Sequence, residues 1–188
     1  MAEVFSFRPA LLRRVADWHI AGHTLTGPDG DCDLRSVTRL RWVNHRIADS
    51  RMTRLDLVSP TGTTQIALNI GSAAGDDDPD RAAHLALCAS VAQLLASHNS
   101  ALPVYLGDSP GAQWAMFAVG LLTLAGGLGL AIAIGISGLS SDRLSAVAMP
   151  VLLLIGLGAF IVKANGPWRK PVQISVEGLT KVLAPNVS

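Results

Sequence analysis

The chain has 188 residues, of which 49% are hydrophobic and 15% charged, with a formal net charge of +1. This near-neutral balance argues against a polyanionic partner such as nucleic acid for the chain as a whole. The two cysteines, Cys32 and Cys88, lie far apart, which suits a reducing compartment better than a disulfide framework.

The composition changes sharply along the chain. Residues 1–112 are mixed and polar, with ten arginines and no lysine, whereas residues 113–162 are almost entirely apolar. The N-terminus carries no apolar run of signal-peptide length, so we expect the polar part to stay on the side of the membrane where it is made. We place one domain at 1–100 and a linker at 101–112.

Five segments of the first domain are typical of β-strands. Leu55 and Leu57, and then Ile66 and Leu68, fall on one face at a period of two. The segments GPDGD and SPTG that separate the strands are typical of turns. The expected strands cover residues 4–8, 18–26, 34–43, 53–58 and 64–70.

The segment GPDGDCDL, residues 27–34, is the most chemistry-like feature of this domain. A calcium-binding loop of the EF-hand type that starts at Asp29 needs a glycine and a glutamate where Leu34 and Leu40 stand, so this loop is rejected. The best available set of zinc ligands is His19, His23 and Cys32. Three ligands from separate segments fall short of a structural zinc site. We therefore predict no metal site and interpret the segment as the turn of a hairpin that joins 18–26 to 34–43.

Arginines are concentrated after this turn, with six between Arg35 and Arg54 and one aspartate among them. Strand alternation over 34–43 puts Leu40 and Trp42 in the core and leaves the arginines on the other face. The predicted partner or lipid surface consists of Arg35, Arg39, Arg41 and Arg46. Anionic lipid headgroups, an acidic partner subunit and plain solvent remain open as what this surface meets. Nucleic acid is disfavoured because no aromatic platform accompanies the arginines.

Residues 78–98 predict an amphipathic helix that closes the domain. Asp78 is suited to cap it and Pro79 to occupy its first turn. An apolar stripe carries His84 and Cys88 on its edge, a pair that we interpret as part of the core rather than as a catalytic dyad. The chain contains no GxSxG, Walker A or HExxH motif. We therefore expect no catalytic residues, no cofactor and no enzyme activity.

The order of strands and closing helix is similar to that of bacterial pleckstrin-homology-like (PH-like) domains. The resemblance covers residues 15–98 and rests on WHIAGHTLTG, CDLRSVTRLRW, MTRLDLVSPTG and the helix that follows. It implies an α+β domain in which the helix covers an antiparallel sheet, and a role in binding partners or membrane surfaces. Five expected strands are fewer than the seven usual in that family.

Two apolar runs predict a transmembrane helical hairpin at 113–163, with helices at 113–139 and 143–163. Residues 114–139 contain no charge, and at about 1.5 Å per residue they exceed a hydrocarbon core of about 30 Å. The expected interfacial anchors are Trp114, Trp168, Arg169 and Lys170. Basic residues are more numerous after the second helix than in the loop, which places both termini in the cytoplasm. The tail, 164–188, alternates in a pattern that predicts a strand at 171–177, with a disordered tail as the alternative.

Small residues recur at a spacing of four in the first membrane helix. Such residues let another helix approach closely. The predicted packing residues are Ala125, Gly127, Gly129, Ala131, Ala133, Gly135 and Ser137. Their partner is either the second helix of the same hairpin or a helix of another subunit.

Neither membrane run contains an internal ionisable residue, which disfavours conduction and membrane redox chemistry. We expect a non-catalytic accessory or assembly subunit of a larger bacterial inner-membrane complex, in contact with lipids and with other integral membrane subunits. The alternative is a membrane-tethered module that recognises anionic lipid headgroups or a small ligand.

Overall fold

A computed structural model describes residues 2–47, 49–71, 74–75, 77–107, 109–137, 141–166, 168 and 171–183. The chain divides into two compact units. Met1–Gly107 together with Pro171–Ser188 form the first, which we call the sheet unit, and Asp108–Lys170 form the second, the hairpin unit.

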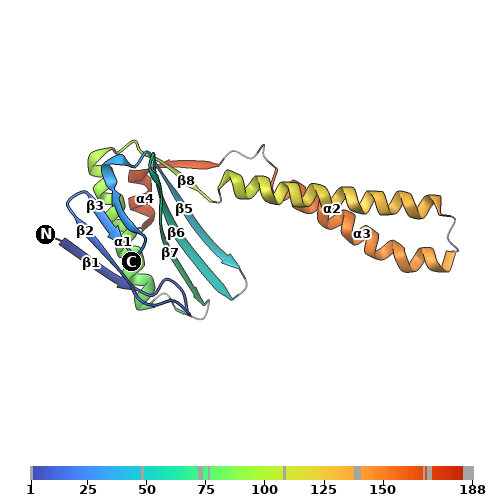
Figure 1. The fold of residues 1–188 in the computed structure, drawn as a ribbon, viewed down its shortest axis with the longest axis horizontal. Helices are drawn as coiled ribbons and strands as arrows, with labels where there is room; N and C mark the ends of the chain where they lie inside the picture. Colours follow the sequence, from blue (N-terminus) through green and yellow to red (C-terminus); the bar gives the residue numbers. More distant parts are fainter. Residues whose placement is uncertain are drawn as a thin grey trace. The chain divides into compact units, whose positions relative to one another are not determined.

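The sheet unit begins with a four-stranded antiparallel sheet in the order β1-β2-β3-β4 (Figure 1). Its strands are β1 (Ala2–Phe7), β2 (Ala16–Ala21), β3 (Thr24–Gly27) and β4 (Gly30–Asp33). Residues alternate between exposed and buried along β2, and its buried side chains belong to the core.

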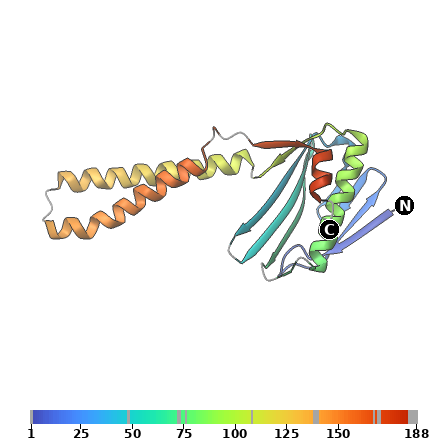
Figure 2. The ribbon, with the colours of Figure 1, turned by 180° about the vertical axis from the view of Figure 1, so that it is seen from behind.

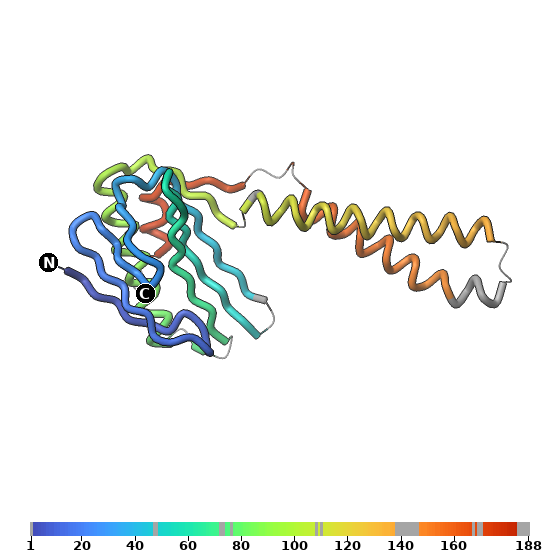
Figure 3. The backbone as a smooth tube through the Cα atoms, viewed as in Figure 1, coloured from blue at the N-terminus to red at the C-terminus, as the bar shows by residue number. Residues whose placement is uncertain are grey.

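The second sheet has five strands in the order β7-β6-β5-β8-β9. They are β5 (Arg39–Ile47), β6 (Ser50–Ser59), β7 (Gly62–Gly71), β8 (Pro103–Leu106) and β9 (Val172–Ser175). β8 runs parallel to β5, and the other neighbours are antiparallel. Figure 3 follows the chain out of this sheet through β8 and back into it through β9.

Helix α1 (Pro79–His98) packs on β1 and β7, one strand from each sheet, and α4 (Val176–Leu183) lies beside it (Figure 2). Asp78 caps α1, because its Oδ1 accepts a hydrogen bond from the backbone N–H of Arg81 at 3.0 Å. Asp80 Oδ1 accepts from the N–H of Arg8 at 2.9 Å, which ties the end of β1 to the first turn of the helix.

Two of the predicted strands are wrong in extent. The segment 18–26 is a tight hairpin, β2 and β3, whose turn uses Gly22 at φ +60°. The segment 34–43 begins with a single 3₁₀ turn, η1 (Leu34–Ser36), because Asp33 Oδ1 accepts from the N–H of Arg35 at 2.9 Å and starts a helical turn. GPDGDCDL therefore turns β3 into β4, and does not join 18–26 to 34–43.

The predicted linker and tail also differ from the structure. Residues 101–112 contain β8, so only Gly107 to Ser109 separate the sheet from the next helix. The tail strand is shorter than 171–177, because residues from Val176 onward form α4. Val176, Leu179 and Leu183 are buried at helical spacing in the same core as the strands.

His84 lies fully buried at the centre of the core rather than at its edge. Its Nε2 donates to the Ile66 carbonyl oxygen at 3.2 Å, while its ring meets Phe7 edge-on and stacks on Trp42. Burial lowers the pKa of His84 to about 4, and the hydrogen bond that His84 donates to the Ile66 carbonyl opposes this only in part. Burial also raises the pKa of the Cys88 thiol, so this pair is a neutral part of the core.

The neutral state of His84 predicts acid sensitivity. Its pKa is about 6.5 when unfolded and about 4 when folded, so between these values the unfolded state binds more protons. The free energy of unfolding should fall by about 3 kcal/mol as pH drops from 7 to 4. His84→Gln keeps a neutral hydrogen-bond donor and should remove this contribution to the pH dependence of the free energy of unfolding. Denaturant titrations of the full chain in detergent at a series of pH values measure it. An unchanged pH dependence in the variant would contradict the assignment.

The tail helix should contribute directly to the stability of the sheet unit. Leu179 is 0% exposed and Val182 is 62% exposed on the same helix. Leu179→Ala should cost about 3 kcal/mol, whereas Val182→Ala should be nearly neutral. Amide hydrogen exchange of β8 and α1 measures both, and equal protection in the two variants would show that α4 is not part of the core.

Candidate functional site

The hairpin unit consists of α2 (Pro110–Ile136) and α3 (Ser141–Ala164), close to the predicted 113–139 and 143–163. Both contain stretches long and apolar enough to cross a membrane, Gly111–Ile136 and Val147–Ala164. Only 11% of each stretch is buried, unlike the core helix of a water-soluble protein. The chain thus has two candidate membrane-spanning helices, compatible with a two-pass membrane protein.

Three glycines bring the two helices into close contact. A Cβ at Gly158 of α3 would lie 2.5 Å from the backbone N of Leu124, and one at Gly127 of α2 would lie 2.8 Å from Ile155 Cγ1. A Cβ at Gly120 would lie 2.9 Å from the backbone N of Val162. We call this contact the glycine seam. The prediction identified Gly127 but missed Gly120, which lies two turns before Gly127 on α2, and Gly158 on α3.

The predicted packing residues divide between two sides of α2. Gly127 is buried in the seam and Ala131 is half-buried beside it. The others are exposed: Ala125, Gly129, Ala133, Gly135 and Ser137. At 100° per residue, the small residues opposite Gly127 form a row that we call the outer ridge. The outer ridge consists of Ala118, Ala125, Gly129 and Ala133, all exposed, of which Ala125, Gly129 and Ala133 follow one another four residues apart while the large side chain of Leu122 separates Ala118 from them.

Aromatic side chains gather at one end of the hairpin. Phe117 meets Trp114 with ring centroids 5.8 Å apart and Trp168 at 5.9 Å, both edge-on. Both tryptophans are exposed, as interfacial anchors are. Arg169 and Lys170, the other two predicted anchors, lie outside the described residues.

The four predicted surface arginines do not share one face. Arg35 lies in η1 rather than on the strand, and in β5 the alternation turns Arg46 to the side opposite Arg39 and Arg41. Arg41 lies directly across from Asp56 on β6, a register that the sequence of one strand does not reveal.

Asp56 is only 3% exposed and its Oδ1 lies 2.8 Å from Arg54 Nε. Burial raises the pKa of the Asp56 carboxyl, while the charges of Arg54 and Arg41 act to lower it. Arg54 is therefore paired with a buried carboxylate, and the charge of Arg41 acts on the same carboxylate from the neighbouring strand, which weakens the face as a lipid-binding surface.

A polar cleft, made of two adjoining hollows of about 300 and 560 Å³, lies between the β3–β4 turn and the β6–β7 turn. Asp31, Thr63 and Thr64 line both hollows. The first hollow adds Trp18, Asp29, Gly30 and Gln65, and the second adds Thr24, Cys32, Asp33, Ser36, Ser59, Thr61 and Gly62. Its lining thus holds three carboxylates, many hydroxyls and no basic side chain. Sequence reasoning took GPDGD and SPTG as separate turns and did not bring them together.

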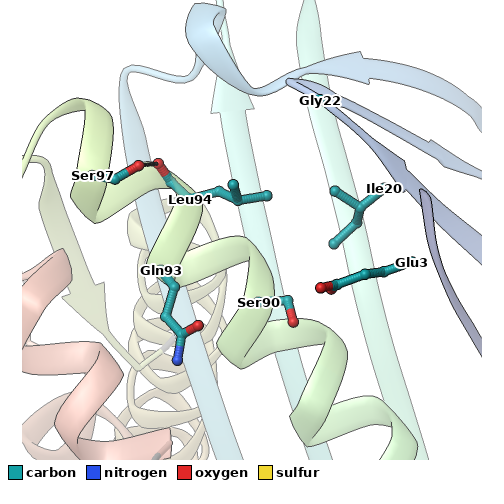
Figure 4. A pocket seen from close by; sticks show the side chains of 7 residues that line it. All are labelled: Glu3, Ile20, Gly22, Ser90, Gln93, Leu94 and Ser97. Carbon is teal, nitrogen blue, oxygen red and sulfur yellow. Dashed lines mark hydrogen bonds between the residues drawn. The ribbon is translucent and has the colours of Figure 1, made fainter. Parts of the chain in front are cut away.

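A separate hollow of about 410 Å³, outside the polar cleft, lies between α1 and the β1–β2 pair. Figure 4 shows the Glu3 side chain pointing from β1 towards Ser90 on the helix, with Ile20 and Leu94 providing apolar surface nearby. One exposed carboxylate and a few neutral polar groups suit weak binding of a small polar group, without a geometry that selects one.

The residues considered for zinc are not gathered into a site. Cys32 is buried among the core residues, whereas His19 is exposed on β2. The ring of His23 lies 6.1 Å from the ring of His98. Within the part of the chain that the structure describes, no three His, Cys, Asp or Glu side chains are placed to hold a metal ion.

No family model, curated protein or solved structure matches this chain. Function therefore has to be inferred from the glycine seam, the outer ridge and the polar cleft themselves.

The glycine seam yields a matched test within one helix. Gly158→Ala places a methyl group against the backbone of Leu124 and should destabilise the hairpin by about 1 to 3 kcal/mol. Gly156→Ala is the same change on α3, with nothing within 4 Å, and should have little effect. Thermal unfolding in detergent measures both, and equal midpoints would show that the helices do not pack through this seam.

Proposed function

We propose that this chain is a non-catalytic accessory or assembly subunit of a larger bacterial membrane complex. In this proposal the hairpin spans the inner membrane, both termini lie in the cytoplasm, and the sheet unit docks on cytoplasmic parts of the partner subunits. The observation that carries the proposal is the outer ridge, a row of small residues that stays open after the glycine seam has been used.

Small residues on a lipid-facing surface need a reason. Lipid tails are as apolar as leucine, so a membrane helix gains nothing from small side chains unless another helix packs against them. The seam with α3 accounts for Gly120 and Gly127. It does not account for Gly129, where a Cβ would meet nothing within 4 Å, or for its exposed neighbours Ala125 and Ala133. A transmembrane helix of another subunit is the partner that this row fits.

The chemistry of the spans supports a structural role. Residues 111–136 and 147–162 contain no Asp, Glu, Lys, Arg or His. Ion conduction, proton transfer and ligation of a redox cofactor in the membrane normally need such side chains. Orientation follows from the basic residues, since Lys163, Arg169 and Lys170 follow α3 while Arg143 alone is near the loop.

The sheet unit supports the proposed PH-like identity better than the sequence did. β1 to β7 precede α1, which gives the seven strands usual in that family where the sequence predicted five. β8, β9 and α4 are additions to that pattern. PH-like domains bind partners or membrane surfaces, and between these two the ion pair of Arg54 with Asp56, which lies opposite Arg41, favours a protein partner over lipid headgroups.

Purification of the tagged chain from its native membrane in mild detergent tests the proposal. At least one integral membrane protein should co-purify, and Gly129→Leu should reduce its yield by roughly tenfold because the added side chain holds the partner helix away.

Gly135→Leu is the matched control for this experiment. Gly135 is also exposed with nothing within 4 Å of its Cβ position, but it lies off the outer ridge, so its variant should keep the partner. A monodisperse chain with no co-purifying membrane protein would overturn the assignment.

A further inference from the structure

The polar cleft is bordered by two open strand edges. In the β3–β4 hairpin Leu34 N donates to the His23 carbonyl at 2.8 Å, so the pairs 25–32 and 27–30 are hydrogen-bonded and the pairs 24–33 and 26–31 are not. The backbone N–H groups of Asp31 and Asp33 therefore point away from β3. β4 is the last strand of its sheet, so both donors face the open edge.

β7 presents the second edge. Asn69 N donates to the Pro9 carbonyl at 2.8 Å, away from β6, and the other odd-numbered residues of β7 share that direction. Pro9 and Ala10 thus cover the edge near Asn69, whereas Thr63 and Gln65 lie at the other end, where they line the cleft. Unpaired backbone groups of β4 and β7 therefore border the same space.

The side chains of the cleft select the charge of what enters it. Asp29, Asp31 and Asp33 carry three negative charges, and the remaining polar groups of the lining are neutral. Asp33 is partly committed, because its Oδ1 caps η1 and its carbonyl accepts from the Ser36 hydroxyl at 2.7 Å. Asp29 and Asp31 are exposed, which favours a cationic ligand and opposes an anionic one.

Trp18 adds an unpartnered hydrogen-bond donor to the lining of the cleft. It lines the first hollow, is only 3% exposed, and its indole N–H has no acceptor among the described residues. The opposite edge of the ring lies against Gly27, where any Cβ would collide with it. A buried donor without a partner is costly, and an incoming carbonyl group is the acceptor that satisfies it.

We propose that the polar cleft binds an extended, basic segment of a partner protein, which adds a strand to the open edge of β4. Its backbone pairs with the N–H groups of Asp31 and Asp33, a carbonyl of the segment accepts from Trp18, and its lysine or arginine side chains meet Asp29 and Asp31. Strand addition to a free edge is a recurrent mode of peptide recognition, in which backbone pairing provides affinity and side chains provide selectivity.

This inference rests on the proposed function and names the partner chemistry for it. Cytoplasmic segments next to transmembrane helices are enriched in lysine and arginine. A subunit anchored in the same membrane meets such segments of its partners, so the acidic cleft suits the juxtamembrane segment of another subunit.

The test uses the full chain in neutral detergent and a nine-residue peptide that alternates lysine with valine. We expect saturable binding by calorimetry, affinity that falls as salt rises, and slower amide exchange at Asp31 and Asp33. The double variant Asp29→Asn, Asp31→Asn should weaken binding by about tenfold, since two exposed charge pairs are lost. Asp49→Asn, a change at an exposed turn aspartate outside the cleft, should leave binding unchanged.

Several results would overturn the proposal. One is equal binding of a peptide that has glutamate in place of lysine. Another is undiminished binding by the double variant when the amide hydrogen exchange of α1 shows that the variant is folded. A third is peptide binding that does not slow the amide hydrogen exchange of β4. Asp31→Lys should invert the preference towards the glutamate peptide, which separates charge selection from loss of fold. Gly129→Leu leaves the cleft intact. Loss of peptide binding therefore counts against the cleft proposal, whereas loss of co-purification counts against the proposed function, and the two can be told apart.

Discussion

The pairing of β8 with β9 is the constraint on which the rest of the structure depends. Leu102 to Leu106 and Val172 to Val176 lie on either side of the hairpin unit in the sequence, yet they form adjacent strands of one sheet and Val176 N donates to the Leu102 carbonyl at 3.0 Å. The hairpin is therefore inserted into the sheet unit rather than appended to it. Val176, Leu179 and Leu183 belong to the same core as the strands, so the chain beyond α3 completes a core that begins before α2.

Closure of the sheet unit at one end explains why it is open at the other. Arg8 N donates to Asp80, Asn69 N donates to the Pro9 carbonyl, and His84 donates to the Ile66 carbonyl, which together fix β1, β7 and α1 to one another. The bond at Asn69 lies in the C-terminal part of β7 and the bond at Ile66 lies at its middle. The two-residue turns at 28–29 and 60–61 hold the other parts of β4 and β7, and no described strand joins those edges. An opening between the sheets is thus built into the topology, and its acidic lining comes from Asp29 in the turn that follows β3 and from Asp31 and Asp33 on β4.

Local patterns in the sequence predicted the elements that depend on local interactions. The uncharged run in the hairpin, the cap and stripe of α1, and the alternation in β6 and β7 are signals of this kind, and the structure has an element at each. The split of β2 from β3 was missed because Gly22-His23 lacks a strong turn signature, and α4 was missed because Val172, Ile174 and Val176 continue a strand period into the helix. The parallel pairing of β8 with β5, the Arg41–Asp56 register and the cleft depend on residues far apart in the sequence, which no single segment encodes.

In the proposed function, the outer ridge recognises a partner within the membrane and the polar cleft recognises one in water. In the membrane, where apolar burial gives no advantage, only the close fit allowed by small residues can favour one helix over another, and α2 uses glycine at the seam and again on the outer ridge. In water, charge and unpaired backbone groups can select a partner, and the cleft provides both. Anionic lipid headgroups are repelled by Asp29 and Asp31, so a membrane surface does not compete for the cleft as it would for an exposed arginine. In the proposed function the same carboxylates attract the basic segments that border transmembrane helices, so the cleft selects a protein segment over a lipid surface.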